Sequence, residues 1–293
     1  KMHACGHDGH MDMVLGAAEA IARRRQFNGT VHLIFQPAEE TVGGGKLMVE
    51  DGLFDRCPCD AVFALHNIDR LPEGTIALKD GPIMAAVDEV RIKILGKGGH
   101  GAIPEDTADP IVAGASIVMA LQTVVSRNTA PHDPAVVTVG AFRSGTVSNI
   151  IPSEAELVLG IRSVTPETRA LMKTRITDIA RLQAESLGCT AEIEYQPSYD
   201  ATVNHKSETA FVRRMALEFA GADRVIEVDR PVMGSEDFGY MLQACPGCMF
   251  FMGTGREDGS IRPLHHPEYD FNDNILTFGA GFWTYLTEQF LAG

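Results

Sequence analysis

The sequence predicts an α/β protein with a mostly parallel sheet, into which a smaller α+β domain is inserted. Two strand-length apolar runs follow a helical pattern at the start of the chain, an order typical of α/β domains. The pattern changes near Gly81 to alternating strands and returns to α/β character after Pro197. We therefore expect a first domain of residues 1–84 and 198–293 and an inserted domain of residues 85–197, which suits a chain of 293 residues.

The first domain opens with an amphipathic helix over residues 9–25, where apolar side chains recur every three or four positions. Residues 30–35 and 59–65 are largely apolar runs, as is typical of strands buried on both faces. The remaining elements of this domain follow the insert: helices over 208–220, 238–242 and 274–291, and strands over 225–228 and 249–252.

The insert begins with an alternating strand over residues 89–95 and a glycine-rich stretch, residues 96–101. Thr165 precedes Pro166 as a plausible helix cap. The other expected elements are helices over 109–125 and 166–187, and strands over 135–142, 155–161 and 191–195. This order of strands and helices is the split βαβ, or ferredoxin-like, arrangement.

Charge and composition exclude several classes of protein. Asp and Glu outnumber Lys and Arg by 39 to 25, and the net charge of −14 argues against nucleic acid or an anionic membrane surface as the main partner. No apolar run reaches the ~18 residues of a membrane span. Six cysteines are too few for a disulfide scaffold, so we expect small buried thiols and a reducing, cytoplasmic compartment.

The first candidate for chemistry is the segment from His3 to His10, which also holds Cys5 and His7. A thiolate and imidazoles in a turn before a helix are good ligands for a borderline metal such as zinc. Asp8 could orient His7. The alternative is an accidental cluster of histidines at an exposed end of the chain.

Further polar residues follow the predicted strands. Glu39 and Glu40 come after the first strand, where open α/β sheets place their active sites, and one carboxylate could bind a metal while the other acts as a general base. His66 follows the second strand, and His265 and His266 lie in a later loop. The alternatives are a solvated acidic loop, a structural histidine and a polar surface loop.

Together these residues offer five ligands: Cys5, His7, Glu40, His66 and one of His265 or His266. Five are too many for one tetrahedral zinc ion. They suit two metal ions about 3.5–4 Å apart that share a bridging ligand.

Six segments, in order, resemble the motifs of one metallopeptidase family, the amidohydrolase branch of the dinuclear aminoacylase/carboxypeptidase group. Its members include N-acyl-L-amino-acid amidohydrolases, hippurate hydrolases and plant indole-acetyl-amino-acid hydrolases. The resemblance spans the chain, and residues 121–128 look most like hippurate hydrolases. It implies a zinc-peptidase-like catalytic domain. The segments are residues 3–8 (HACGHD), 35–40 (FQPAEE), 64–67 (ALHN), 96–100 (GKGGH), 234–238 (GSEDF) and 264–267 (LHHP).

The resemblance implies roles for the candidate residues. Cys5 looks like a bridging thiolate, and the other ligands of two Zn, Mn, Co or Ni ions look like His7, Glu40, His66 and His265. His265 is preferred to His266 because the family motif reads Leu-His-x-Pro. Glu39 looks like the general base, which takes a proton from water and passes it to the leaving amine.

The resemblance also implies that the inserted domain serves as a lid and forms a homodimer. His100 would then reach the partner's active site and stabilise the oxyanion, while Asn149 and Arg162 would bind the substrate. From the residues alone, His100 is a loop histidine and Arg162 a surface charge. The substrate would be a small N-acyl amino acid.

Two departures from the family pattern leave other functions open. Family members carry a further segment before the first motif, so we expect the natural amino terminus to lie upstream of Lys1. The lid loop has Gly101 and Glu105 where the family usually has other residues. One alternative is a non-catalytic, metal- or ligand-binding relative disabled by truncation. A weaker one is a dipeptidase or carboxypeptidase of the same group, which Cys5 argues against because those branches use aspartate as the bridging residue.

Overall fold

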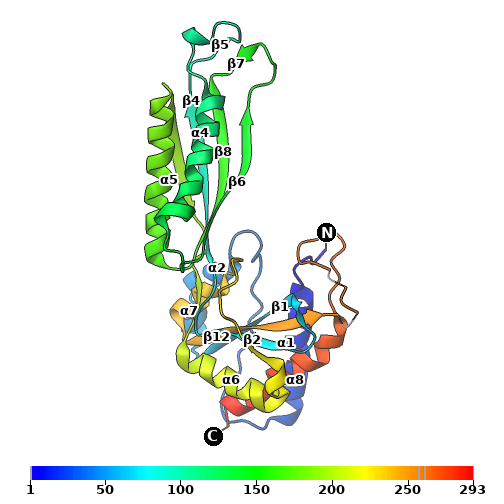
Figure 1. Ribbon diagram of the computed structural model, residues 1–293. Helices are drawn as coiled ribbons and strands as arrows, with labels where there is room; N and C mark the ends of the chain where they lie inside the picture. The colour runs from blue at the N-terminus through cyan, green and yellow to red at the C-terminus, as the bar shows by residue number, and fades with distance from the viewer. Residues whose placement is uncertain (1, 257, 261, 293) are drawn as a thin grey trace. The chain divides into compact units, whose positions relative to one another are not determined.

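The computed structural model describes residues 2–256, 258–260 and 262–292, which form two compact units (Figure 1). Unit 1 comprises the chain up to Ile83, Thr202–Arg230 and the residues from Asp237 onward. Unit 2 comprises Met84–Ala201 and the short segment Pro231–Glu236. Assigning catalysis to unit 1 and dimerisation to unit 2 remains a prediction.

Unit 1 contains a four-stranded mixed sheet, where the sequence suggested a mostly parallel one. Its strand order is β1 (Val62–Pro72), β12 (Gly247–Gly255), β2 (Ile76–Leu78) and β11 (Val225–Glu227). β1 pairs with β12 and β11 with β2 in parallel, but β12 and β2 are antiparallel. The connection from β1 to β2 is a short turn, and a parallel strand would need a long crossover.

Three helices cover one face of this sheet: α1 (His7–Arg24), α6 (Lys206–Ala220) and α8 (Leu276–Phe290). Their shared core includes the fully buried Met13, Phe250 and Phe282. All three helices were predicted, as were β1, β11, β12 and α7 (Phe238–Ala244), but β1 continues to Pro72, so His66 lies within this strand and not after it. The smaller elements are α2 (Gly44–Glu50), α3 (Leu53–Arg56), the 3-10 turns at Ala222–Arg224 and Asp273–Ile275, and the pair β3 (Gly81–Met84) and β10 (Thr202–Asn204).

The strand predicted over residues 30–35 is wrong. This segment has no strand conformation, and its Leu33 and Phe35 side chains are exposed. It borders a cavity of about 450 Å³ whose lining includes Val62 of β1 and Leu286 of α8. An apolar run becomes a strand only where a neighbouring backbone pairs with it, and no described strand does so here.

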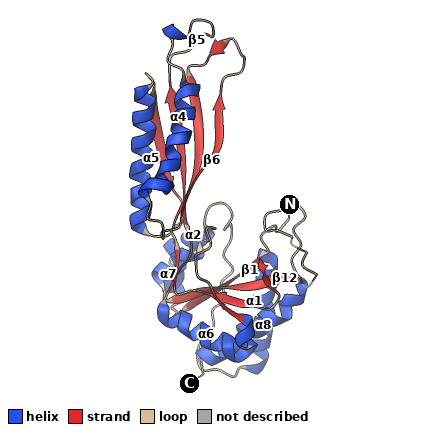
Figure 2. Cartoon of the chain, viewed as in Figure 1, coloured by secondary structure: helices blue, strands red, loops and turns tan. Residues whose placement is uncertain are grey.

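Unit 2 is an antiparallel sheet with two helices on one face (Figure 2). Its strand order is β6 (Ala135–Ser144), β8 (Glu154–Ser163), β4 (Ala86–Leu95) and β9 (Thr190–Pro197). The helices are α4 (Pro110–Thr123), continued by a π-helical turn (Val124–Asn128), and α5 (Pro166–Ser186). This is the order of strands and helices that the sequence predicted, and Thr165 caps α5 as expected. A short pair, β5 (Gly99–His100) with β7 (Ile150–Ile151), and a 3-10 turn, Pro104–Asp106, complete the unit.

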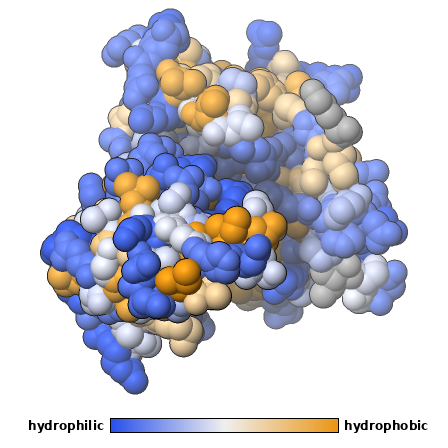
Figure 3. Space-filling view, turned by 90° about the horizontal axis from the view of Figure 1, so that it is seen from above, coloured by the Kyte–Doolittle hydropathy of each residue, from blue (hydrophilic) through white to orange (hydrophobic). Residues whose placement is uncertain are grey.

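One helix among the described residues, Pro110–Asn128, is long and apolar enough to cross a membrane, although the sequence analysis found no such run. Its inner face, with Ala113, Ile117 and Leu121, is fully buried in the core of unit 2. Its outer face exposes Val112 and Met119. A helix in the core of a protein can be equally long and apolar, so length and composition alone do not indicate a membrane span. Figure 3 shows a surface on which hydrophilic residues predominate and hydrophobic ones form separate patches.

None of the six cysteines, all of which the structure describes, forms a disulfide. Cys189, Cys245 and Cys248 are buried, as expected, whereas Cys5, Cys57 and Cys59 are only partly buried. Cys248 lies in strand β12, which begins two residues before the predicted strand over 249–252.

A buried ion pair anchors the first strand of unit 2 to helix α5. The Asp88 carboxylate is 1% exposed and accepts hydrogen bonds from Arg169 Nε at 3.1 Å and from the Tyr195 hydroxyl at 2.8 Å. Arg169 also pairs with Asp200, which follows β9. The chain therefore enters and leaves unit 2 next to the same guanidinium group.

We expect Arg169→Met to destabilise the protein by about 3–5 kcal/mol, because it leaves the Asp88 carboxylate buried without its cation. Urea unfolding of unit 2, followed by circular dichroism, measures this change. Arg181→Met is the matched control on the same helix, since the Arg181–Glu185 pair is half exposed. It should cost about 0.5 kcal/mol or less, and an equal loss in both variants would contradict the role of Asp88.

Candidate metal centre

Gly6 sets the geometry of the first two candidate ligands. It has φ 83°, and helix α1 begins at the next residue, His7. A Cβ atom at position 6 would lie 2.6 Å from the Tyr269 hydroxyl and 2.7 Å from Asn67 Oδ1. Only glycine fits both the backbone and this close contact. Cys5 and His7 therefore flank a glycine that packs directly against the buried side chains of Tyr269 and Asn67.

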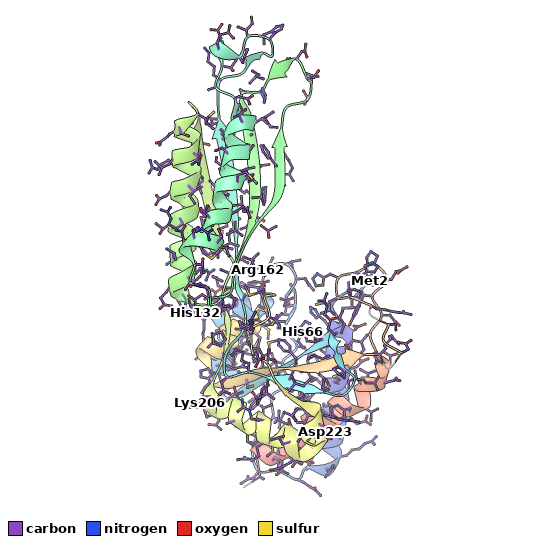
Figure 4. All side chains as sticks on the ribbon, viewed as in Figure 1. Met2, His66, His132, Arg162, Lys206 and Asp223 are labelled. Atoms are coloured by element: carbon purple, nitrogen blue, oxygen red, sulfur yellow. The ribbon has the colours of Figure 1, made fainter. Side chains whose placement is uncertain are left out.

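His66 enters the site from strand β1, as its label in Figure 4 shows. Its side chain is buried, and Nδ1–H donates to the backbone carbonyl of Asn67 at 2.7 Å. This bond leaves the lone pair of Nε2 directed at the site, where Nε2 lies 3.5 Å from Cys5 Sγ. Burial lowers the pKa of His66 to about 4 in the absence of metal, so the ring is neutral and ready to bind an ion at pH 7.

Glu39 and Glu40 lie on a tight loop. Ala38 has φ 59°, and its carbonyl accepts from the backbone N–H groups of residues 41–43 at 3.2 Å. The fully buried Asp237 holds the end of this loop, accepting from Gly45 N at 2.6 Å and from the Gln36 amide at 3.3 Å. The two glutamates are thereby fixed together above a third carboxylate.

The structure decides between His265 and His266. His265 has φ 65°, its backbone N–H donates to Ala4 O at 2.7 Å, and its Nε2 lies 3.2 Å from Glu40 Oε1. His266 is exposed, and its Nδ1 accepts from Glu268 N at 3.1 Å. His265 therefore joins the cluster and His266 does not.

The candidate ligands form overlapping groups whose donor atoms all lie within 4.8 Å of one another. The groups are Cys5, His7 and His66; Cys5, Glu40 and His265; and His7, Glu39 and Glu40. Cys5, His7 and Glu40 each belong to two of the groups, so the donor atoms form one continuous cluster. Sulfur, imidazole and carboxylate donors together suit zinc and the neighbouring divalent transition metals, so the residues fit the metal pair that the sequence predicts.

The charges of this cluster favour a bound cation. Burial, with the charges of Glu40 and Asp237, raises the pKa of Glu39 to about 7. Burial lowers the pKa of His7, against the opposing charge of Glu40. In the metal-free protein the Glu39 carboxylate therefore resists ionisation and the His7 imidazole resists protonation. A divalent ion would relieve both, because it stabilises carboxylates and binds neutral imidazole.

The other three predicted site residues belong to unit 2. His100 is exposed, and its Nδ1 accepts from Ala102 N at 3.0 Å. The Asn149 carbonyl accepts from Gly101 N at 2.9 Å, which ties the β5 and β7 turns together. Arg162, labelled in Figure 4, lies on β8 and donates to the Ser235 hydroxyl at 2.9 Å. None of the three lies within the donor groups of unit 1.

Sequence reasoning missed the residues that hold the ligands in place. Asn67 and Tyr269 are buried beside the cluster, and Asp237 lies beneath the glutamate loop. Each is an ordinary residue type with no metal-ligand spacing of its own. Their only indication was adjacency to a motif: Asn67 follows His66, and Asp237 lies in the segment 234–238.

Comparison with known proteins supports the resemblance to amidohydrolases that the sequence motifs indicate. The chain is 38% identical over 290 residues to the hippurate hydrolase of Campylobacter jejuni, covering 99% of this chain and 74% of the relative. It is 41% identical to the N-acetyldiaminopimelate deacetylase of Priestia megaterium, covering 97% and 74%. A relative from Saccharolobus solfataricus that is 37% identical is named thermostable carboxypeptidase 1, with 95% and 71% covered. Relatives with hydrolase names identify the chain as an amidohydrolase.

A solved structure agrees with the fold. A dinuclear metal-binding peptidase of Bacillus subtilis, YXEP, superimposes with a TM-score of 0.80 at 31% identity, covering 99% of this chain and 73% of that one. That protein is described as a member of family M20, and the donor groups of this chain likewise suit divalent metal ions. The profile described as "Peptidase family M20/M25/M40" matches residues 1–289. The resemblance drawn from the sequence motifs is confirmed: the chain belongs to peptidase family M20/M25/M40.

Proposed function

We propose that this enzyme hydrolyses the amide bond of N-acyl amino acids, with hippurate-like compounds as substrates. The observation that carries the proposal is the overlap of three donor groups, in which Cys5, His7 and Glu40 each belong to two and Glu39 belongs to the third. Such a cluster suits two metal ions and one general base. The hippurate hydrolase name of a 38% identical relative favours this substrate class.

Two divalent ions, Zn, Mn, Co or Ni, would be held by Cys5, shared between them, and by His7, Glu40, His66 and His265. When bound, the ions supply Lewis-acid polarisation of the amide carbonyl and lower the pKa of water. The His66 Nδ1–H bond to Asn67 O fixes the tautomer that leaves Nε2 free to bind.

Glu39 acts as the general base. It is held on the loop that Asp237 secures, and its carboxylate lies 4.0 Å from His7 Nε2. The carboxylate accepts a proton from the attacking water and then donates it to the nitrogen of the leaving amino acid. Its neighbour Glu40 is reserved for metal binding, which separates the roles of two adjacent carboxylates.

We assign substrate recognition to unit 2. Arg162 is half buried and, within the described part of the chain, has no acidic partner. Burial lowers the pKa of this guanidinium, with no neighbouring carboxylate to offset it. A substrate carboxylate would supply the missing anion. Asn149 contacts the same substrate, and His100 stabilises the oxyanion in the active site of a partner copy.

A homodimer through unit 2 is part of the proposal. Strand β6 forms one edge of the sheet, and α4 exposes Val112 and Met119, the latter 72% exposed. An open strand edge beside apolar side chains favours pairing with a second copy. The absence of disulfides among six cysteines supports a reducing, cytoplasmic compartment.

The carboxypeptidase name of one relative keeps cleavage of N-acylated peptides as a second candidate. A non-catalytic relative is the third. Hydrolysis of hippurate compared with N-acyl dipeptides distinguishes the first two, and failure to hydrolyse either despite bound metal would favour the third.

Hippurate hydrolysis by the purified chain with Mn²⁺ or Zn²⁺ tests the proposed function directly. We expect metal-dependent release of glycine and a loss of at least about 10³-fold in kcat for Glu39→Gln, because the base is removed. Metal content, measured by atomic emission, should remain at two ions per chain in Glu39→Gln.

Glu50→Gln is the matched control, since Glu50 is an exposed residue on nearby α2. It should keep full activity. Turnover that survives in Glu39→Gln, or that persists after chelation, would overturn the assignment of the base or of the metals.

The pKa of Glu39 predicts a pH-dependent stability in the metal-free protein. The folded pKa, about 7, is above the ordinary value of 4.5, so ionised Glu39 destabilises the fold above pH 7. This cost disappears as the pH falls from about 7 to 4.5. Glu39→Gln should therefore be more stable than wild type by on the order of 2–3 kcal/mol at pH 8. Urea unfolding with a chelator at pH 8 and pH 4.5 measures the difference, and equal stability at pH 8 would contradict it.

Mixed dimers test whether His100 acts on the partner subunit. We expect His100→Ala and Glu39→Gln each to be inactive, but a heterodimer of the two to contain one intact site. Random mixing should therefore restore about a quarter of the wild-type activity. No recovery in heterodimers isolated with two affinity tags, or a wild-type chain that is a monomer by light scattering, would refute the shared site.

A further inference from the structure

We propose that Asn67 is a positioning residue that fixes three ligand-bearing segments of the metal site relative to one another. The inference rests on the proposed metal centre. It goes beyond that centre because Asn67 binds no ion and no substrate in the scheme above.

The side chain of Asn67 joins two segments that are far apart in the sequence. Its Oδ1 lies 2.6 Å from Nε2 of His10, on the first turns of the helix that begins at His7, and the backbone N–H of Asn67 donates to the same Nε2 at 3.0 Å. Its Nδ2 donates to the Tyr269 hydroxyl at 2.9 Å, in the loop that follows His265. One amide therefore links the segment of Cys5 and His7 to the segment of His265.

The backbone of Asn67 controls the third segment. Its carbonyl accepts the Nδ1–H of His66 at 2.7 Å, and this bond leaves Nε2 directed at Cys5. Metal-binding histidines are oriented in this way by the partner of their other ring nitrogen. Side chain and backbone of one residue thus act on ligands from three places in the chain.

An amide is the group that this position requires. Asn67 is fully buried, so its Oδ1 must accept and its Nδ2 must donate within the protein. An apolar side chain of similar size would remove the donor to the Tyr269 hydroxyl and leave His10 with only the backbone N–H of residue 67. Gly6 leaves room for the network, because a Cβ there would overlap both Asn67 Oδ1 and the Tyr269 hydroxyl.

Asn204 offers a matched control for a merely structural asparagine. It is also buried, and its side chain bonds Lys79 O, Met249 O and Met249 N at 2.7–3.0 Å. These partners lie on the sheet and carry no metal ligand. Loss of either amide should destabilise unit 1, but only loss of Asn67 should disturb the site.

The test is Co²⁺ binding to the full-length chain, measured by visible absorption in competition with a chelator. We expect Asn67→Ala to weaken cobalt binding about 10–100-fold and to alter the thiolate charge-transfer band of Cys5. Asn204→Ala should lower the midpoint of urea unfolding about as much as Asn67→Ala does. It should keep the wild-type cobalt affinity and spectrum. An unchanged affinity and spectrum in folded Asn67→Ala would overturn the inference.

Tyr269→Phe keeps the proposal testable if Asn67→Ala fails to fold, since it removes only a hydroxyl. It should weaken cobalt binding in the same direction by a smaller factor, and the double variant should lose less than the two single losses combined. Full additivity, or no effect of Tyr269→Phe, would overturn the network. A wild-type chain that binds no cobalt would refute the proposed metal centre itself, whereas normal wild-type binding with normal variants refutes only this inference.

Discussion

The parallel pairing of β1 with β12 is the constraint on which the site depends. The pair aligns His66 with Phe251 and Asn67 with Met252, inside a strand that is buried on both faces. Because β12 cannot shift without moving that core, the middle of β1, where His66 and Asn67 lie, is a fixed point. The start of α1 and the loop after His265 are held to it through the contacts of Asn67 with His10 and Tyr269. The glutamate loop is held separately, by Asp237.

Electrostatic repulsion among the side chains of the site explains why the segments that carry them must be held firmly in place. Glu39, Glu40 and the buried Asp237 lie close together, while His7 and His66 resist protonation. Like charges at this spacing repel one another unless a cation lies between them. The backbone bonds of Ala38 and the amide contacts of Asp237 keep the loop closed against that repulsion. Rigidity at this loop and affinity for a divalent ion are therefore two results of the same arrangement.

Periodicity predicted most of the fold because helices and strands here follow ordinary burial patterns. The helix at α1, the strands of unit 2 and the Thr165 cap were all found from apolar spacing and capping residues. The error at residues 30–35 arose because apolar composition does not say whether a partner strand is present. Ligand candidates were found from residue type, and the family motif favoured His265 over His266, but how His265 reaches the cluster, with φ 65° and a bond to Ala4, is seen only in the structure. Asn67 and Tyr269 could not be found at all, because long-range hydrogen bonds leave no local pattern.

Because unit 2 interrupts unit 1 in the sequence, the order of synthesis also constrains how the chain folds. Val62 of β1 pairs with Gly247 of β12, so the first strand waits for its neighbour until nearly the whole of unit 2 has left the ribosome. Contacts between such distant residues are slow to form. Unit 2, by contrast, is almost continuous and can fold as soon as it emerges, which brings the ends of its long segment, Met84 and Ala201, to fixed positions. The folded insert thus shortens the effective loop that must close when β12 pairs with β1, and this favours assembly of the sheet of unit 1.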